Sequence, residues 1–200
     1  MVHNPRGDGN CGFRALAIEL FGVEETYKKV KVAMRDYYFN NCANDYAEYP
    51  HERLENILHP ERNEWFLFPE CAQIAADTFK TPVAFYYEHE SQQRSYIFFP
   101  LQVIPTHAER TNPIVLQHTN AHIFLVKIKS DHPLQWPEIY PQRPLGRHEI
   151  RSDPWYSLFK DSFENSIRPH PGYKLPEERE VDAIILSDTD SESEIFDLTK

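Results

Sequence analysis

The sequence predicts an α+β fold in which helices precede a small, mostly antiparallel sheet. Residues 11–79 carry apolar side chains at helical spacing, whereas residues 82–128 contain short runs rich in Val, Ile, Tyr and Phe. Polar connections separate these runs. A hydrophobic fraction of 40% in 200 residues is enough for one packed domain with an extension.

Helical periodicity recurs four times before the first strand. The first helix begins at Cys11 and ends at Gly22, a residue type that commonly terminates helices. The four helices are expected at Cys11–Phe21, Glu24–Asn40, around Arg53–Leu58, and at Pro69–Phe79. We expect the last of them to pack on the sheet.

Four strands are expected after these helices. The runs are Pro82–Tyr87, Ser95–Phe99, Ile114–Gln117 and His122–Ile128. The polar stretch Glu88–Arg94 between the first two is typical of a hairpin connection.

The composition changes twice after the sheet, which predicts three regions: 1–130, 131–176 and 177–200. The middle region holds eight of the sixteen prolines together with several aromatic residues, so we expect an extension packed on or linked to the domain. A short helix is expected there from Trp155 to Asn165. The last region is acidic and rich in serine, which predicts a disordered tail.

Charge and cysteine content argue against several classes of protein. Residues 177–200 contain nine acidic and two basic residues, a net charge of −7, which leaves −3 for the rest of the total of −10. Clustered Lys and Arg are lacking, so we expect no nucleic-acid partner. The three cysteines lack zinc-site spacing, and no apolar run is long enough for a membrane span. We therefore expect an intracellular monomer without metal or cofactor.

A flexible turn places Cys11 at the start of the first helix. The turn contains Gly7 and Gly9, and the free N–H groups of a helix N-terminus follow it. The helix dipole favours a thiolate, which predicts a lowered pKa for Cys11, and the same N–H groups can hold an oxyanion. By contrast, Cys42 and Cys71 fit ordinary structural cysteines.

The residues around this cysteine resemble the active-site signature of the ovarian-tumour (OTU) deubiquitinases, D-G-N-C-x-F-R-A. The matching segment is Gly7, Asp8, Gly9, Asn10, Cys11, Gly12, Phe13, Arg14, Ala15 and Leu16. The resemblance covers about residues 5–128 and implies a papain-like OTU fold acting on ubiquitin or polyubiquitin. It implies Cys11 as nucleophile, with Asp8, Gly9, Asn10 and Cys11 forming the oxyanion hole.

The resemblance also points to His122, which opens a late strand, as the catalytic base. Many relatives carry an Asp or Asn two residues further on, but that position is Phe124. Asn120 is an alternative third member, with a turn residue as the competing interpretation. Some relatives take this acid from upstream, and only residues 1–6 precede the turn. Either the chain is truncated or the triad is minimal.

Residues in the middle of the chain resemble the family's tryptophan, core helix and strand. The matching positions are Trp65, Glu70, Ala72, Ile74, Ala75, Ala76, Pro82, Val83 and Ala84. We expect Trp65 to be a core residue rather than part of the site.

The tail carries aliphatic runs flanked by acids that resemble SUMO-interacting motifs. The predicted SUMO-binding residues are Val181, Ile184, Ile185 and Leu186, with a second copy at Ile195, Phe196 and Leu198. Such a segment can add as a strand to a partner's sheet. Alternatively, the first run is a tether that docks on the chain's own domain. SUMO binding implies residence in the nucleus and/or the cytoplasm.

Three functional hypotheses follow. The first is a cysteine isopeptidase that removes ubiquitin, targeted to SUMO-modified substrates by the tail. The second is a non-catalytic adaptor that binds ubiquitin or SUMO. The third is a peptidase for SUMO or another ubiquitin-like modifier.

Overall fold

The computed structural model describes residues 1–43, 45–87, 95–101, 112–128, 136–141 and 154–159. Its elements follow the chain in this order: β1 (Val2–His3), α1 (Cys11–Phe21), a 3-10 turn η1 (Glu24–Thr26), α2 (Tyr27–Asn41), α3 (His51–Ile57), α4 (Glu70–Phe79), β2 (Val83–Tyr87), β3 (Tyr96–Phe98), β4 (Ile114–Thr119), β5 (His122–Val126) and β6 (Glu138–Ile139). Residues 154–159 are also helical. None of the helices in these ranges is long and apolar enough to cross a membrane.

The strands form one sheet in the order β1-β5-β4-β2-β3-β6. Three neighbouring pairs are antiparallel, namely β1 with β5, β4 with β5, and β2 with β3. The β2–β4 and β3–β6 pairs are parallel. The sheet is thus mixed, and its mostly antiparallel character, predicted from the sequence, is confirmed.

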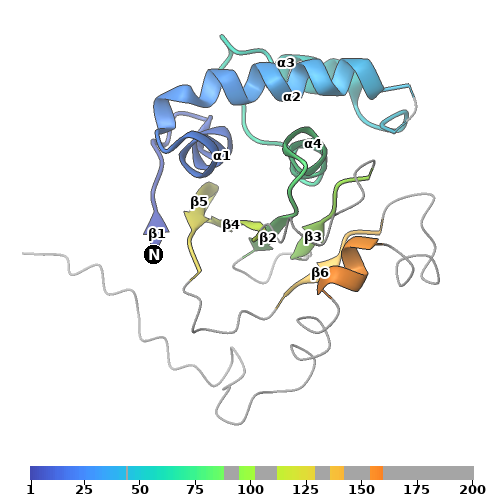
Figure 1. Cartoon of the computed structure of the whole chain (residues 1–200). Helices are drawn as coiled ribbons and strands as arrows, with labels where there is room; N and C mark the ends of the chain where they lie inside the picture. Colours follow the sequence, from blue (N-terminus) through green and yellow to red (C-terminus); the bar gives the residue numbers. More distant parts are fainter. Residues whose placement is uncertain (44, 88–94, 102–111, 129–135, 142–153, 160–200) are drawn as a thin grey trace, which may run out of the picture. The chain divides into compact units, whose positions relative to one another are not determined.

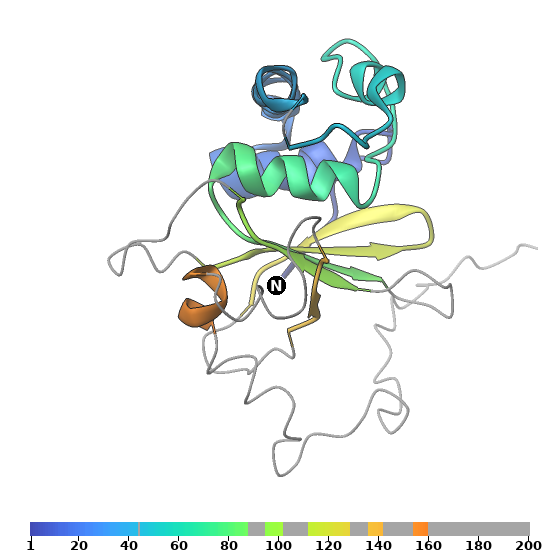
Figure 2. The ribbon, with the colours of Figure 1, turned by 90° about the vertical axis from the view of Figure 1, so that its right-hand side faces the viewer.

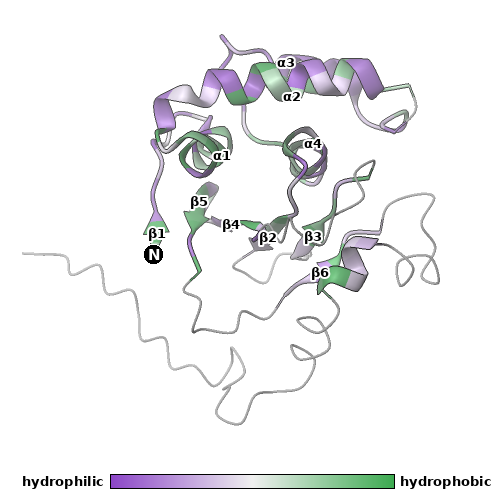
Figure 3. Ribbon diagram, viewed as in Figure 1, coloured by the Kyte–Doolittle hydropathy of each residue, from purple (hydrophilic) through white to green (hydrophobic). Residues whose placement is uncertain are grey.

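The helices cover one face of the sheet in two layers. Figure 1 looks along α1 and α4, which lie between the sheet and α2. Figure 2 shows the same order from the side, with α2 and α3 outermost. Figure 3 shows that α1 and α4 are more hydrophobic than the outer α2. The main core lies between these layers and includes Phe13, Leu16, Ile74 and Leu116, none of which has any exposed surface.

All four predicted helices and four predicted strands exist, with shifted ends. The largest difference is at Glu24, where the chain first makes a 3-10 turn before α2 starts at Tyr27. Gly22 ends α1 in the left-handed conformation with φ of 81°, as the sequence predicts. The pairing of β2 with β3 agrees with a hairpin, whose connection 88–94 lies outside the described residues.

The opposite face of the sheet carries a second, smaller core. It is built from buried residues of β2, β3 and β4 and from Trp155, with Phe99 and Trp155 rings stacked at 6.2 Å. Residues 136–141, which include β6, and residues 154–159 are the described parts of the extension 131–176. The rest of the expected helix to Asn165 and the tail 177–200, with both SUMO-like motifs, lie outside the described residues.

Candidate active site

Cys11 is the first residue of α1 and lies against the start of β5. Its thiol is 8% exposed, and the backbone N–H groups of Ile123, Gly12 and Cys11 itself face the sulfur. Because Ile123 follows His122 directly, the packing of α1 on β5 brings the predicted nucleophile and the predicted base to one place. These two residues are 111 positions apart in the sequence, so the fold rather than local structure joins them.

The pKa of the Cys11 thiol is raised rather than lowered, which differs from the expectation based on the helix dipole. Burial is the largest cause, and the negative charge of Asp8 adds to it, whereas the three backbone N–H groups act in the opposite direction. Burial outweighs the helix N-terminus because the thiol is almost entirely removed from water. The free thiol is therefore protonated near neutral pH, and a base must remove its proton.

Asp8 holds the turn before Cys11 through its side chain. The carboxylate pairs with the Arg14 guanidinium, with Oδ2 to Nη2 at 2.6 Å, and accepts a hydrogen bond from the Asn10 backbone N–H at 3.1 Å. Arg14 is almost fully buried, and its guanidinium also lies 4.1 Å from the Tyr27 ring centre. The Arg14 hydrogen bonds lower the pKa of Asp8 to about 2. The Asp and the Arg of the motif are thus a pair across the turn that presents Cys11.

His122 begins β5 and lies beside this turn. A Cβ added to Gly7 would be 3.7 Å from the His122 Nδ1 atom, so glycine leaves room for the imidazole next to the turn. The ring meets Phe124 edge-on with centroids 4.7 Å apart. The other ring nitrogen, Nε2, is buried and has no hydrogen-bond partner among the described residues. An apolar ring therefore lies beside the imidazole, at the position two residues after His122.

Asn120 lies at the tip of the hairpin between β4 and β5. Thr119 pairs with His122, and the two residues between them, Asn120 and Ala121, have φ of 49° and 61°. This is the two-residue turn with both central φ values positive, for which Asn is a preferred residue. Asn120 is exposed, and the described structure records no hydrogen bond between it and His122. Turn geometry alone accounts for an asparagine here, and a catalytic role for it stays a prediction.

A loop that the sequence does not single out supports the turn from the other side. We call residues 59–66, between α3 and α4, the brace loop. Its Asn63 accepts a hydrogen bond from the Asn10 side-chain amide at 2.9 Å, and Asn10 has no exposed surface. Phe66 packs so tightly on α1 that a Cβ added to Gly12 would lie 2.7 Å from it. Neither Asn63 nor Phe66 carries a pattern that reveals this role.

Trp65 also belongs to the brace loop, and the expectation that it is a core residue is wrong. The side chain is 62% exposed, and its Cδ1 atom would be 3.6 Å from a Cβ on Gly9. The loop has no regular periodicity, so no pattern in the sequence distinguishes a buried tryptophan from an exposed one. An exposed aromatic beside the candidate oxyanion turn is a candidate contact for a substrate backbone.

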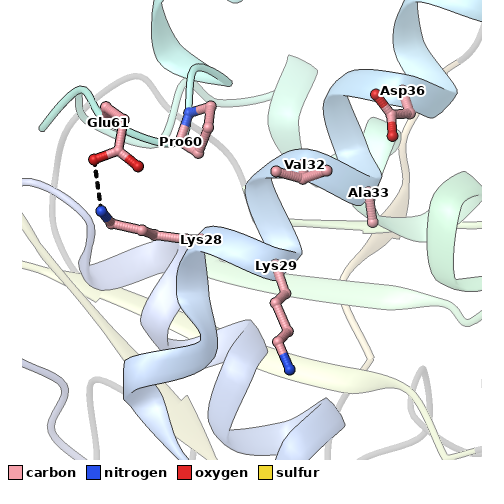
Figure 4. A pocket seen from close by; sticks show the side chains of 7 residues that line it. All are labelled: Lys28, Lys29, Val32, Ala33, Asp36, Pro60 and Glu61. Carbon is pink, nitrogen blue, oxygen red and sulfur yellow. Dashed lines mark hydrogen bonds and ion pairs between the residues drawn. The ribbon is translucent and has the colours of Figure 1, made fainter.

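Two further features of the described residues lie apart from Cys11 or are absent. The described residues contain no group of three or more His, Cys, Asp or Glu that could hold a metal ion. The groove drawn in Figure 4, of about 470 Å³, lies between α2 and the brace loop. Its lining residues are Lys28, Lys29, Val32, Ala33, Asp36, Pro60 and Glu61. None of them belongs to the surroundings of Cys11.

Comparison with known proteins places the fold. No protein-family model and no curated protein matches the sequence. The structure is similar to the viral OTU domain protease from Taggert virus, with a TM-score of 0.50 and 18% identity over 70% of this chain and 84% of that one. It also matches the Hazara virus OTU bound to ubiquitin, with a TM-score of 0.46 and 20% identity over 64% of this chain and 82% of that one. A third match is the OTU domain of OTUD1, with a TM-score of 0.47 and 11% identity over 62% of this chain and 83% of that one. The chain has the OTU fold, as the motif around Cys11 predicts.

Proposed function

We propose that this chain, with its OTU fold, is a thiol-dependent isopeptidase that removes ubiquitin from lysine side chains. The Cys11 sulfur attacks the carbonyl carbon of the C-terminal glycine, after its proton has passed to His122. The C–N bond to the lysine then breaks, and the His122 proton goes to the leaving amine. Water then hydrolyses the thioester: its oxygen bonds to the acyl carbon, the C–S bond breaks, and a proton from the water passes through His122 to the departing sulfur. This step restores the thiol and releases ubiquitin with a free carboxylate.

The position of Cys11 carries this proposal. A thiol at a helix N-terminus, with backbone N–H groups around it and a histidine next to it, matches the requirements of acyl transfer. The raised pKa of the thiol makes the histidine necessary, because the proton must leave before attack. A purely structural cysteine would not need a turn held on both sides by an ion pair and a brace loop.

The turn itself is suited to stabilise the tetrahedral intermediate. Gly9 has φ of 86°, a conformation that glycine adopts without strain, and this orients the peptide groups between Asp8 and Cys11. The Asp8 side chain is occupied by Arg14 and the Asn10 N–H, so its part in the oxyanion hole is to position backbone rather than to donate. The turn is thereby preorganised, which is the source of most oxyanion stabilisation.

Electrophilic probes test the proposal directly. The full chain is incubated with C-terminal electrophile derivatives of ubiquitin and, in parallel, of SUMO. We expect an adduct with the ubiquitin probe that is lost in Cys11→Ala and strongly slowed in His122→Ala. An adduct with the SUMO probe alone would instead identify a SUMO peptidase.

One observation favours a second candidate function, a non-catalytic adaptor. The buried Nε2 of His122 has no partner and Phe124 lies beside it, so the imidazole lacks the acceptor that orients it in a triad. An adaptor would bind ubiquitin without forming an adduct. Ubiquitin binding by Cys11→Ala and wild type alike, with no adduct in either, would support it.

We also propose that the tail directs the enzyme to SUMO-modified proteins. The support is the sequence alone, an aliphatic run at residues 181–186 followed by alternating acids and Ser or Thr. Titration of fluorescent SUMO with the full chain should give binding that is lost when Ile184, Ile185 and Leu186 are changed to Ala. Unchanged binding in that variant would contradict the targeting role.

A further inference from the structure

Lys31 on α2 is a lysine with no exposed surface, although it lies in a helix whose neighbouring lysines face solvent. Its ammonium donates to two backbone carbonyls of the brace loop, Arg62 O at 2.7 Å and His59 O at 3.3 Å. The third direction is taken by the Phe13 ring, whose centre is 4.7 Å from Nζ. Burial of an ammonium is costly unless its donors are satisfied, and here carbonyls and a ring face satisfy them.

Burial is the largest influence on this ammonium and lowers the pKa of Lys31 to about 8. Ionisable groups on three elements, Cys71 on α4, Glu64 on the brace loop and Asp8 on the turn, act in the opposite direction. The described residues contain no carboxylate within ion-pair distance of its ammonium. The bonds to the brace loop are therefore the principal polar interactions of this side chain.

These bonds end next to the residue that holds the nucleophile turn. Arg62, whose carbonyl takes the shorter bond, directly precedes Asn63, whose side-chain oxygen accepts from the buried Asn10 amide. The Asn63 carbonyl would also be 3.4 Å from a Cβ on Gly9. Two hydrogen bonds, joined by the backbone between Arg62 and Asn63, thus link α2 through the brace loop to Asn10, the residue before Cys11.

We propose that Lys31 is a positioning residue for the acyl-transfer reaction, which holds the brace loop so that Asn63 fixes the Asn10 amide and with it the oxyanion turn. This inference rests on the proposed function for its kinetic consequence. It acts on the transition state rather than on substrate binding, because Lys31 has no exposed surface and reaches the turn only through the brace loop.

The kinetic test compares turnover of an isopeptide-linked ubiquitin substrate by wild type, Lys31→Met and Asn63→Ala. We expect kcat to fall about 10- to 100-fold in each variant with KM nearly unchanged, because small displacements of the turn affect mainly the transition state. The double variant should lose little more than either single one, since both changes break the same chain of bonds. Asn63 is exposed, so Asn63→Ala tests the inference even if Lys31→Met folds poorly.

Two lysines of the same helix provide matched controls. Lys28 forms an exposed ion pair with Glu61 of the same loop at 2.6 Å, and Lys29 lines the groove beside it (Figure 4). Lys28→Met and Lys29→Met should keep kcat within about twofold, because exposed ion pairs contribute little. If kcat fell as much in Lys28→Met as in Lys31→Met, any contact between α2 and the brace loop would matter equally. That result would overturn the specific role of Lys31.

Amide hydrogen exchange separates this inference from the proposed function. In Lys31→Met, the N–H groups of residues 9–12 should exchange at least about tenfold faster than in wild type, whereas β4 should be unaffected. This readout does not require turnover. A folded wild type without isopeptidase activity would overturn the proposed function, while unchanged exchange at residues 9–12 in Lys31→Met would overturn the role of Lys31.

Discussion

The two sides of the candidate active site are held in very different ways. On the nucleophile side, the turn before Cys11 is fixed by the Asp8–Arg14 ion pair, by the Asn10–Asn63 hydrogen bond and by Phe66 packed on Gly12. On the base side, His122 has one buried nitrogen without a partner and an apolar neighbour, Phe124. Polar interactions and packing together fix the first side, whereas in the described residues ring packing surrounds the imidazole on the second.

This difference indicates where catalytic precision is built into the chain. The nucleophile turn must present backbone N–H groups at one position, and any movement weakens the hold on an oxyanion. The imidazole can instead be confined by an aromatic ring and by the turn at Gly7. Substitutions on the nucleophile side should therefore affect stability and reactivity together, whereas those on the base side should change rate with little effect on stability.

The largest effect is expected from Asp8→Ala. The change leaves the buried Arg14 without its carboxylate, which should lower the free energy of unfolding by about 3 kcal/mol, and should slow ubiquitin-probe labelling more than tenfold. Chemical denaturation measures the free energy of unfolding, and the rate of reaction with the ubiquitin probe measures the labelling. Asp36→Ala, an exposed aspartate on α2, is the control and should change stability by less than about 0.5 kcal/mol.

The same ion pair predicts a pH dependence with a defined sign. The pKa of Asp8 is about 2 in the folded protein, below the ordinary 3.8, so its contribution to stability is present above about pH 4 and is lost as the pH falls toward 2. This contribution should be missing from the stability profile of Asp8→Ala. If the free energy of unfolding fell equally for the variant and wild type between pH 4 and pH 2, the result would contradict the Asp8–Arg14 ion pair.

A smaller effect is expected from Gly12→Ala. The new methyl group would lie 2.7 Å from Phe66, whose ring is packed between Phe13 and Phe85 and has little room to move. We expect a loss of about 1–3 kcal/mol in the free energy of unfolding and slower labelling of Cys11. Gly22→Ala at the other end of α1 should reduce stability through its positive φ but leave labelling unchanged.

On the base side, Phe124→Asp should increase the rate. A carboxylate at this position can accept the Nε2–H of His122, and such a bond to a charged group corresponds to about a tenfold gain in kcat/KM. Phe124→Leu removes the ring without supplying an acceptor and should give no gain. If Phe124→Asp folds but its kcat/KM does not rise, the imidazole of His122 is already fully oriented in wild type.

The smallest effect is expected from Asn120→Gly. Glycine adopts the positive φ of the hairpin turn, so stability should stay within about 0.5 kcal/mol of wild type while the amide is removed. Isopeptidase rates should stay within about twofold. A loss of more than tenfold would identify Asn120 as the third catalytic residue after all.

Elements with a strong local signal could be predicted from the sequence. The helix at Cys11–Phe21 has apolar spacing along its length and a glycine at its end, and its bounds agree with the structure. Strands β1 and β6 have two residues each, too few for any periodic pattern, and they exist only because the neighbouring strands β5 and β3 present free edges. The 3-10 turn at Glu24 likewise depends on its surroundings, where Glu24 O accepts from Arg14 at 3.4 Å.

The residues of the candidate site also differ in how strong a local sequence signal they have. Cys11 and Asp8 lie in one contiguous motif, and the resemblance that this motif carries points to His122 at the start of a recognisable strand. The catalytic roles of these residues stay predictions. Lys31 and Asn63 are 15 or more residues from the end of the motif at Leu16 and are of common surface types. Their roles arise from the packing of α2 and the brace loop around the turn, which no local pattern encodes.

Cleavage of isopeptide-linked di-ubiquitin tests the central claim most directly. The 200-residue chain, Cys11→Ala and His122→Ala are compared at equal concentration, with folding of each variant checked by thermal denaturation. We expect wild type to release mono-ubiquitin, Cys11→Ala to release none, and His122→Ala to be slower by at least about a hundredfold. Cleavage by folded Cys11→Ala, or no cleavage by folded wild type, would contradict the assignment of Cys11 as the nucleophile of an isopeptidase.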